Sequence, residues 1–172
     1  MKTKAIFFDR DGVINERILG GYIRRWDEFH FMPGVGETLK QTKDRGYLAI
    51  IITNQRGVGL GLMMQSDLDA IHERMQSELQ HGHGVQFDDI ISCTDSQNES
   101  GRRKPSPAML LEAQKKYDID MSVSWMIGDT PSDIEAGNAA GVKTAFLLNA
   151  HDEPPPEATI SIALLEEFVT YL

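Results

Sequence analysis

Two aspartates separated by one residue follow a short apolar run near the start of the sequence. The run AIFF at residues 5–8 leads directly into Asp9, Arg10 and Asp11. Side chains at positions i and i+2 of a strand point the same way, so both carboxylates can face one site. At a separation of 4 Å and an effective dielectric constant of about 20, two such charges repel by roughly 4 kcal/mol. The pair therefore indicates a site that uses concentrated negative charge.

Three further polar clusters also follow apolar runs. Residues 53–57 (TNQRG) offer a hydroxyl, side-chain amides and backbone N–H groups, which are the donors that a phosphate group needs. Residues 102–104 (RRK) form the densest positive cluster, and residues 128–133 (GDTPSD) carry two more acids. Mg²⁺ binds oxygen ligands, often one or two carboxylates together with phosphate and water. We therefore expect Asp9 and Asp129 to hold Mg²⁺, which would offset the repulsion between the acids.

Short buried strands that alternate with helices are expected to position these clusters. Strands are predicted at five continuous apolar runs, typical of a parallel sheet covered on both faces: 5–8, 48–52, 90–92, 125–127 and 144–148. Helices are predicted at 35–45, at 66–80 with Ser66 as the N-cap, from Ser106-Pro107, from Thr130-Pro131, and at 161–170 after a loop at 151–156. The alternation predicts an α/β fold with a doubly wound parallel sheet and helices on both faces, in one domain over residues 1–172. In such sheets ligands bind beyond the carboxyl ends of the strands, where the four clusters would meet.

The composition excludes several classes of function. A formal net charge of −9 argues against a nucleic-acid backbone as the partner. A membrane span needs an apolar run of about 18 residues, and the sequence has none of that length. The N-terminal residues do not form a signal-peptide pattern. A single cysteine, Cys93, excludes an internal disulfide and suits a reducing compartment. We therefore expect a cytoplasmic protein, monomeric, with a small-molecule partner rather than a nucleic acid or a membrane.

The four clusters, taken in order, resemble the four motifs of the haloacid dehalogenase-like phosphohydrolases. DRDGV at 9–13 resembles the DxDG signature, TN at 53–54 the motif after the second strand, Lys104 the third-motif lysine, and GDTPSD at 128–133 the GDxxxD motif. The resemblance covers residues 4 to about 148. Within this superfamily the chain is similar to the D-glycero-D-manno-heptose 1,7-bisphosphate phosphatases and the related histidinol-phosphate phosphatases. Four stretches carry that similarity: DRDGVIN, GYIRRWDEFHFMPGV at 21–35, TNQRGVGLG at 53–61 and RKPSPAML at 103–110.

The resemblance implies an Mg²⁺-dependent phosphomonoesterase without a large cap domain, since the motif spacing leaves no room for one. Asp9 would be the nucleophile and form an aspartyl-phosphate. Asp11 would protonate the leaving alcohol and then activate water. Mg²⁺ would be bound by the carboxylates of Asp9 and Asp129 and by the backbone carbonyl oxygen of Asp11.

The resemblance also implies which residues contact the substrate. The transferring phosphoryl group would be held by Thr53, Asn54 and Lys104, and Arg103 would add a planar fork for phosphate oxygens. Weaker candidates for substrate contact, with surface placement as the alternative, are Gly21, Tyr22, Gln55 and Arg56. A sugar bisphosphate, most simply a heptose bisphosphate that loses its C7 phosphate, is the expected substrate. Histidinol phosphate is the alternative within the family.

Two features depart from the pattern of the resembled enzymes. Many of them carry a zinc-binding loop with four Cys or His ligands, and the corresponding positions here are Cys93, Asp95, Ser100 and Arg102. One thiol cannot complete a four-ligand zinc site, so we expect no zinc and a loop held by packing or hydrogen bonds. Thr130 stands where several relatives have lysine, which removes one possible contact with phosphate.

Three alternatives remain open from the sequence. Asp133 is equally compatible with a role in the site and with capping the helix that begins after Thr130. A phosphoaccepting receiver domain shares the sheet and the acidic pair, but its phosphoacceptor would lie at the end of a middle strand, where this chain has no aspartate. A nucleic-acid 3′-phosphatase shares the DxDG chemistry but conflicts with the net charge.

His72, His81 and His83 are expected to be exposed to solvent.

Overall fold

In the described part of the chain, residues 2–148 and 153–172 of a computed structural model, six parallel strands form one sheet. The strand order is β3-β2-β1-β4-β5-β6, and every neighbouring pair is parallel. The strands are β1 (Lys4–Phe8), β2 (Tyr47–Asn54), β3 (Asp89–Cys93), β4 (Trp125–Gly128), β5 (Lys143–Leu147) and β6 (Ile160–Ile162). The predicted doubly wound parallel sheet is confirmed.

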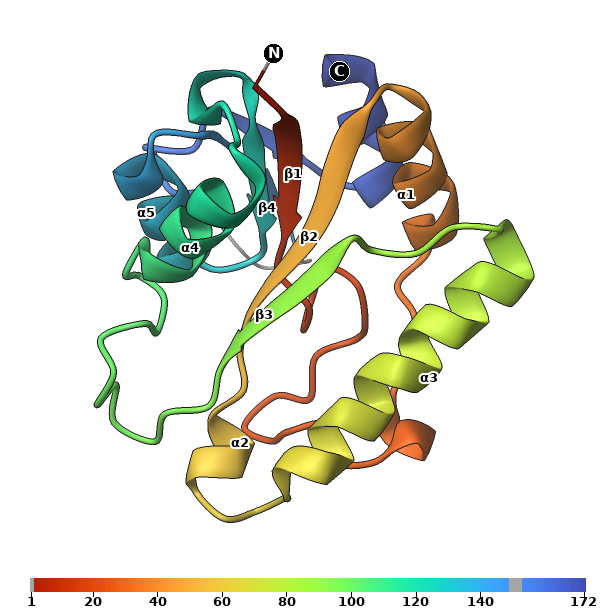
Figure 1. The fold of residues 1–172 in the computed structure, drawn as a ribbon, viewed down its shortest axis with the longest axis vertical. Coiled ribbons are helices and arrows are strands. Elements are labelled where there is room, and N and C mark those ends of the chain that lie inside the picture. The colour runs from red at the N-terminus through yellow and green to blue at the C-terminus, as the bar shows by residue number, and fades with distance from the viewer. Residues whose placement is uncertain (1, 149–152) are drawn as a thin grey trace.

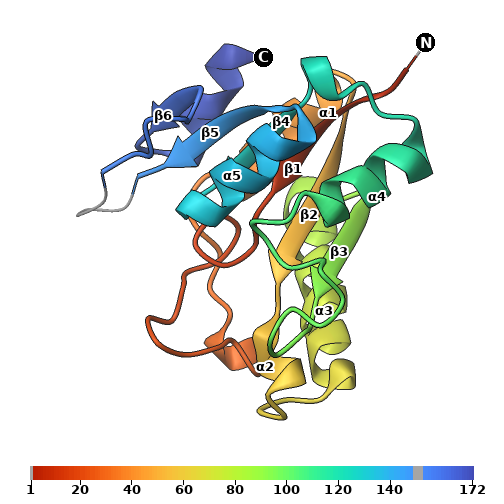
Figure 2. The same cartoon turned by 90° about the vertical axis from the view of Figure 1, so that its left-hand side faces the viewer.

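Helices cover both faces of this sheet (Figure 1). They are α1 (Val35–Asp44), α2 (Arg56–Gly59), α3 (Gln65–His83), α4 (Ala108–Tyr117) and α5 (Pro131–Ala140), with 3₁₀ helices at Trp26–Glu28, Met121–Val123 and Leu165–Tyr171. Figure 2 shows α4 and α5 side by side over one face, while α1 and α3 lie on the other. No cap domain interrupts the described residues, and none of their helices is both long and apolar enough to cross a membrane.

Two apolar layers explain why the strands read as continuous apolar runs. Ile6 and Phe8 of β1 pack with the layer under α1 and α3, whereas Ala5 and Phe7 pack with the layer under α4 and α5. All four side chains are buried. Burying one large apolar side chain contributes about 1.5–3 kcal/mol. The sheet is therefore packed on both faces. The polar residues at the ends of its strands are held in place by this packing.

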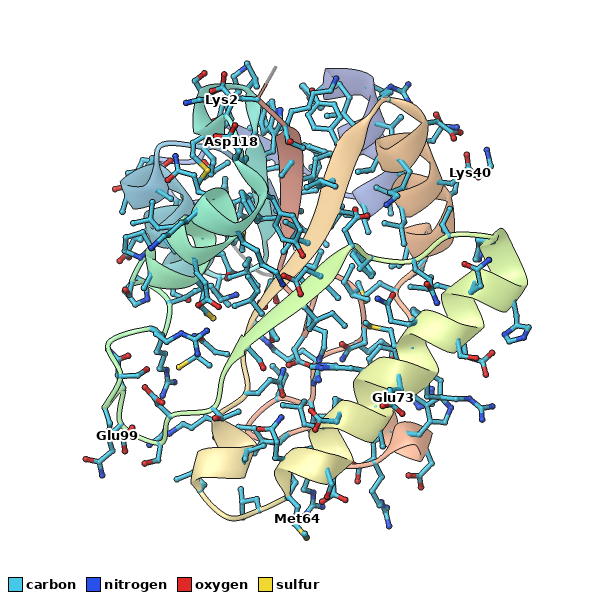
Figure 3. The ribbon with its side chains drawn as sticks, in the orientation of Figure 1. Lys2, Lys40, Met64, Glu73, Glu99 and Asp118 are labelled. Atoms are coloured by element: carbon cyan, nitrogen blue, oxygen red, sulfur yellow. The ribbon has the colours of Figure 1, made fainter. Side chains whose placement is uncertain are left out.

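The strand order reverses between β1 and β4, which places a crevice at their carboxyl ends. The Asp9 N–H donates to the carbonyl oxygen of Ile127 at 2.9 Å, so the ends of the two strands are fastened together. Met64 and Glu99, in segments that follow β2 and β3, lie at the end of the molecule toward which the strands run (Figure 3). Lys2 and Asp118 lie at the opposite end. The crevice thus opens toward the loops that follow the strands.

Three predicted elements differ from the structure, and one helix was not predicted. The predicted helix at 161–170 is strand β6 followed by a 3₁₀ helix, whose three-residue turn suits the buried pair Leu165 and Phe168. Helix α3 has Met64 rather than Ser66 at its N-cap, with Asp67 accepting the Met64 N–H at 2.7 Å. Helix α4 begins at Ala108, after Pro107. Helix α2 was not predicted, because two of its four residues are glycines.

The structure describes only part of the loop that was predicted at residues 151–156. The first two residues of the predicted loop at 151–156 lie outside the described residues, and residues 153–156 form neither helix nor strand.

Candidate active site

Lys104 is a buried cation held by three acceptors at the carboxyl ends of the strands. Its Nζ lies 2.8 Å from Asp9 Oδ1 and 2.6 Å from Asp133 Oδ1, and it donates to the carbonyl oxygen of Ile52 at 2.8 Å. The Ile52 carbonyl accepts a hydrogen bond from the ammonium, and the two carboxylates form ion pairs with it. Burial alone would lower the pKa of Lys104, but the charges of Asp133 and Asp9 raise it above its ordinary value. Lys104 therefore stays charged and ties the end of β1 to the start of α5.

Three carboxylates meet beside Lys104. Asp9, Asp129 and Asp133 each offer one oxygen, and these oxygens lie within 4.8 Å of one another. Gly12 lets this cluster close, because it has φ +96° and a Cβ there would overlap the Asp129 carboxylate. The donor set consists only of oxygen atoms, which is the set that Mg²⁺ prefers. The cluster therefore fits a hard divalent cation.

Burial makes this concentration of negative charge costly. Burial, with help from Asp133 and Asp129 and against the opposing charge of Lys104, raises the pKa of Asp9 to about 7. Burial likewise raises the pKa of Asp129 to about 6, although the Arg17 guanidinium opposes the shift. Arg17 Nη1 lies 3.3 Å from Asp129 Oδ2. The site thus favours binding of additional positive charge.

Asp133 caps helix α5 and also lies in the acidic cluster. Its Oδ2 accepts the Thr130 N–H at 3.0 Å and the Thr130 hydroxyl at 2.7 Å, which closes the capping box of α5. Its Oδ1 contacts Lys104 as described above. The predicted start of α5, with Thr130 as the N-cap and Pro131 in the first turn, is confirmed. The helix cap and the acidic cluster therefore share one buried side chain.

Asp11 lies apart from this cluster and is surrounded by hydrogen-bond donors. Its carboxylate accepts Arg10 Nη2 at 2.8 Å, Asn15 Nδ2 at 2.9 Å and Gln55 Nε2 at 2.8 Å. Burial would raise the pKa of Asp11, but the Arg10 charge and these hydrogen bonds outweigh burial and hold that pKa below its ordinary value. The two aspartates of the opening motif therefore have opposite electrostatic environments.

A cavity of about 410 Å³ opens over Asp9 and Asp11. Its floor is formed by the strand ends, and much of its wall is the loop from Arg17 to Ile23. The lining residues include the predicted Gly21, Tyr22, Asn54, Gln55, Arg103 and Lys104, and also Arg17, Ile18, Leu19, Gly20, Ile23, Thr130, Ser132 and Asp133. The structure therefore brings most of the predicted site residues to one cavity.

Four residues of the second motif differ in what they do. Thr53 is buried, and its hydroxyl accepts Gln55 Nε2 at 2.8 Å. Asn54 Nδ2 donates to the Lys104 carbonyl at 3.2 Å, and Asn54 Oδ1 accepts the Lys104 N–H at 3.0 Å. The Asn54 amide therefore positions Lys104, which the sequence did not indicate. Arg56 does not line the cavity: its Nε donates to the Ser96 carbonyl at 2.7 Å, so the predicted substrate contact of Arg56 is not supported by this arrangement.

The segment at the four zinc-loop positions is held by hydrogen bonds. Asp95 Oδ2 accepts the Ser100 N–H at 2.7 Å and also the Ser100 hydroxyl. Asn98 Oδ1 accepts the Arg103 N–H at 2.9 Å. Cys93 is a buried free thiol in β3. These contacts show the predicted hydrogen-bonded loop, which turns Arg103 toward the cavity.

Sequence reasoning missed three long side chains around the site. Nothing in the sequence distinguished Arg17 from other loop cations, because no periodicity fixes where a loop residue points. Arg10 gave no signal either, but His72 did. His72 follows the buried Leu68 by four residues and precedes the buried Met75 by three, so it borders the inner stripe of α3. The expectation that His72 is exposed was wrong, because its side chain is partly buried and its Nε2 lies 3.1 Å from Arg10 Nη1.

Comparisons with known proteins agree with this geometry. A curated relative from Helicobacter pylori (strain J99), a D-glycero-beta-D-manno-heptose-1,7-bisphosphate 7-phosphatase, is 37% identical and aligns with 99% of this chain and 97% of its own. A D-glycero-alpha-D-manno-heptose-1,7-bisphosphate 7-phosphatase from Burkholderia mallei is 38% identical over 88% of this chain and 83% of its own.

Solved structures show the same architecture. The crystal structure of D,D-heptose 1,7-bisphosphate phosphatase from B. bronchiseptica, complexed with magnesium and phosphate, superposes with a TM-score of 0.89 at 25% identity and covers 98% of this chain and 97% of its own. The family model described as haloacid dehalogenase-like hydrolase matches residues 15–141. The chain therefore belongs to the haloacid dehalogenase-like hydrolase family.

Proposed function

We propose that this protein is an Mg²⁺-dependent phosphomonoesterase, a single domain over residues 1–172, that removes the C7 phosphate of D-glycero-D-manno-heptose 1,7-bisphosphate. The observation that carries the proposal is the Asp9 carboxylate on the cavity floor, held 2.8 Å from the Lys104 ammonium and clustered with Asp129 and Asp133. The substrate is that of the heptose-1,7-bisphosphate 7-phosphatases to which the chain is 37% and 38% identical. Relatives named for the alpha and beta anomers are about equally similar, so the proposal includes both anomers.

The metal would be held by this chain's oxygen ligands. Asp9 and Asp129 would bind Mg²⁺ through their carboxylates, with Asp133 beside them and the Asp11 carbonyl oxygen as a further ligand. The magnesium in the similar B. bronchiseptica structure supports this choice of ion. When bound, the ion supplies charge that neutralises phosphate oxygens and orients them.

Two aspartates would perform the chemistry. Asp9 attacks phosphorus as the phosphorus–oxygen bond to the sugar breaks, and the departing alkoxide takes a proton from Asp11. Asp11 then removes a proton from a water that attacks the same phosphorus, which releases inorganic phosphate and regenerates the Asp9 carboxylate. Arg10 holds the pKa of Asp11 low in the protein alone, and a phosphate dianion placed beside Asp11 would raise it. The substrate itself therefore favours the protonated form that donates.

Side chains on the cavity wall would recognise the rest of the substrate. Lys104 and Asn54 line the cavity beside Asp9, where the transferring phosphoryl group would sit, and Arg103 and Arg17 line the wall. Thr53 is buried next to Asn54 and would act on the phosphoryl group only through Gln55, whose Nε2 donates to its hydroxyl. A bisphosphate carries a second anion, and Arg offers a planar fork that matches phosphate oxygens. Gly21, Tyr22 and Gln55 remain proposed contacts to the sugar because they line the same cavity.

A substrate comparison tests the proposal. Initial rates of phosphate release from both heptose 1,7-bisphosphate anomers and from histidinol phosphate give kcat/KM for each, and ³¹P spectra of the product show which phosphate is lost. We expect a heptose bisphosphate to have the highest kcat/KM and to retain its C1 phosphate. A preference for histidinol phosphate, or loss of the C1 phosphate, would contradict the substrate assignment. A single stoichiometric burst without turnover would indicate a phosphoaccepting switch instead.

The remaining expectations extend this proposal. We infer a monomeric, cytoplasmic enzyme without zinc, acting on a small molecule rather than on nucleic acid. The support is one buried thiol, Cys93, at the zinc-loop positions and a formal net charge of −9. Elemental analysis after expression in zinc-supplemented medium, together with light scattering, checks the zinc content and the oligomeric state.

A further inference from the structure

Arg10 is the largest fully buried side chain among the described residues, and it carries a charge. A buried charge is strongly unfavourable unless it is paired and hydrogen-bonded. Replacing a buried ion pair with apolar residues of similar volume is often neutral or stabilising, so packing alone does not call for arginine here. The position of Arg10 between Asp9 and Asp11 suggests that its charge serves the neighbouring carboxylates.

The guanidinium of Arg10 points at the Asp11 carboxylate as a fork. Arg10 Nη2 lies 2.8 Å from Asp11 Oδ1 and 3.1 Å from Oδ2, and Arg10 Nε lies 3.3 Å from Oδ1. Asn15 and Gln55 each donate one further hydrogen bond, to Oδ1 and Oδ2 respectively. Both oxygens of Asp11 are therefore held by planar groups, which fixes the carboxylate in rotation as well as in position.

His72 holds the other side of the guanidinium. Its Nε2 lies 3.1 Å from Arg10 Nη1. Arginine has donors and no acceptor, so His72 Nε2 accepts and its ring is neutral in this contact. Burial and the adjacent Arg10 charge lower the pKa of His72 to about 4, in agreement with that assignment. A line of contacts thus runs from helix α3 through His72 and Arg10 to Asp11 on the cavity lining.

We propose that Arg10 and His72 are positioning residues that hold the Asp11 carboxylate where it can transfer a proton to the leaving alcohol. The inference rests on the proposed function, because it assigns a task to the same reaction. Proton transfer requires the acid to lie within about 2.6–3.2 Å of the departing oxygen, and a displacement of about 1 Å can lower the rate on the order of 100-fold. Neither residue is expected to touch the substrate.

Substrates with different leaving groups can show whether Arg10 and His72 position the acid Asp11 or only support the fold. A sugar alkoxide needs a proton to depart, whereas p-nitrophenolate departs without one. The measured quantity is kcat/KM, which includes phosphoryl transfer and alcohol release but not the later hydrolysis of the aspartyl-phosphate. We compare heptose 1,7-bisphosphate with p-nitrophenyl phosphate for the wild type, for Arg10→Met, and for the matched pair His72→Leu and His72→Gln.

The expected result is a loss that depends on the leaving group. Arg10→Met should lower kcat/KM for the heptose bisphosphate on the order of 100-fold, and His72→Leu about 10-fold, while p-nitrophenyl phosphate changes about twofold. His72→Gln keeps an acceptor for Arg10 Nη1 and should stay close to wild type. Equal losses on both substrates, or equal activity of His72→Leu and wild type, would overturn the inference. If Arg10→Met does not fold, the His72 pair decides the outcome alone.

Failure of the proposed function gives a different result. In that case the wild-type protein itself turns over neither substrate. Turnover of p-nitrophenyl phosphate but not of the heptose bisphosphate would reject the substrate, and the same leaving-group comparison then uses glycerol 3-phosphate as the alkyl phosphate.

Discussion

The floor and the wall of the cavity are built in different ways. The floor is a buried network in which Lys104, in the segment between β3 and α4, contacts Asp9 after β1 and Asp133 in α5. Its members are far apart in sequence and meet only because the parallel strands end at the same edge. The wall includes residues 17–23 and Arg103, which ends the loop at 94–103. That loop is held largely by contacts between residues within a few positions of one another. The comparison indicates that the chemistry depends on the sheet and the selectivity on local loop contacts.

The two regions should therefore respond differently to substitution. Removing one member of a buried charge pair leaves the other charge without a partner and lowers the free energy of unfolding by roughly 3–5 kcal/mol. Removing an exposed polar contact is usually worth well under 1 kcal/mol. Changes in the floor should abolish chemistry or alter stability strongly, whereas changes in the wall should alter substrate affinity.

The largest expected effect is that of Asp9→Asn on turnover. An amide cannot form the aspartyl-phosphate, so kcat should fall by at least about 10⁴-fold. Circular dichroism should show an intact fold, and Glu135→Gln, an exposed acid on α5, serves as the matched control. Activity of Asp9→Asn close to wild type would show that the nucleophile is elsewhere.

Lys104→Met tests the cation of the floor. The substitution removes the ammonium next to Asp9 and Asp133, and we expect kcat to fall about 10²–10³-fold, as for loss of one donor to a developing charge. Lys115→Met, an exposed cation on α4, is the control and should keep wild-type kcat. Equal kcat for the two variants would mean that Lys104 only supports the fold.

Stability without divalent ions should depend on the charge of Asp9. The pKa of Asp9 is about 7 in the folded protein against an ordinary value of 3.8, so the folded state binds more protons between these values. The unfolding free energy contributed by Asp9 therefore falls as pH rises from about 4 to about 7. Asp9→Asn lacks this loss, and in EDTA its stability relative to wild type should grow over that range by up to about 4 kcal/mol. Urea denaturation at each pH gives the difference in unfolding free energy between Asp9→Asn and wild type. If that difference does not change with pH, the account of Asp9 as a buried acid is contradicted.

The smallest expected effect is that of Asp95→Asn in the wall. The amide presents one oxygen to the Ser100 N–H and hydroxyl in place of a carboxylate, so the loop that carries Arg103 should loosen. We expect a severalfold rise in KM for the heptose bisphosphate at unchanged kcat, with Glu135→Gln again as the control. A fall in kcat at constant KM would show that the wall takes part in the chemistry.

The same division explains what the sequence could predict. Positions at or just after the carboxyl ends of buried strands, such as Asp9, Thr53 and Asp129, are placed by hydrophobic runs and by the common edge of parallel strands. The capping role of Thr130 and Asp133 was visible in local spacing. Strand β6 was misread because its three residues, ISI, carry too short a pattern to separate a strand from a helix. Such predictions depend on an element being long enough to show its period.

Side chains that bridge elements were beyond the sequence pattern. Arg17 reaches Asp129, and the Asn54 amide bonds the Lys104 backbone, because of loop paths and rotamers that no periodicity encodes. His72 was readable in part, since its helical position borders an apolar stripe, but its partner Arg10 was not. Pairing of long polar side chains requires the three-dimensional structure.

The central claim is that Asp9 accepts the phosphoryl group. Rapid quenching during turnover of the heptose bisphosphate with Mg²⁺, followed by borohydride reduction and peptide mapping, converts an acyl phosphate on aspartate into homoserine at that position. We predict homoserine at position 9 in the wild type, and none when Mg²⁺ is replaced by EDTA. Homoserine at another aspartate, or steady turnover with no reduced residue at any quench time, would contradict the account.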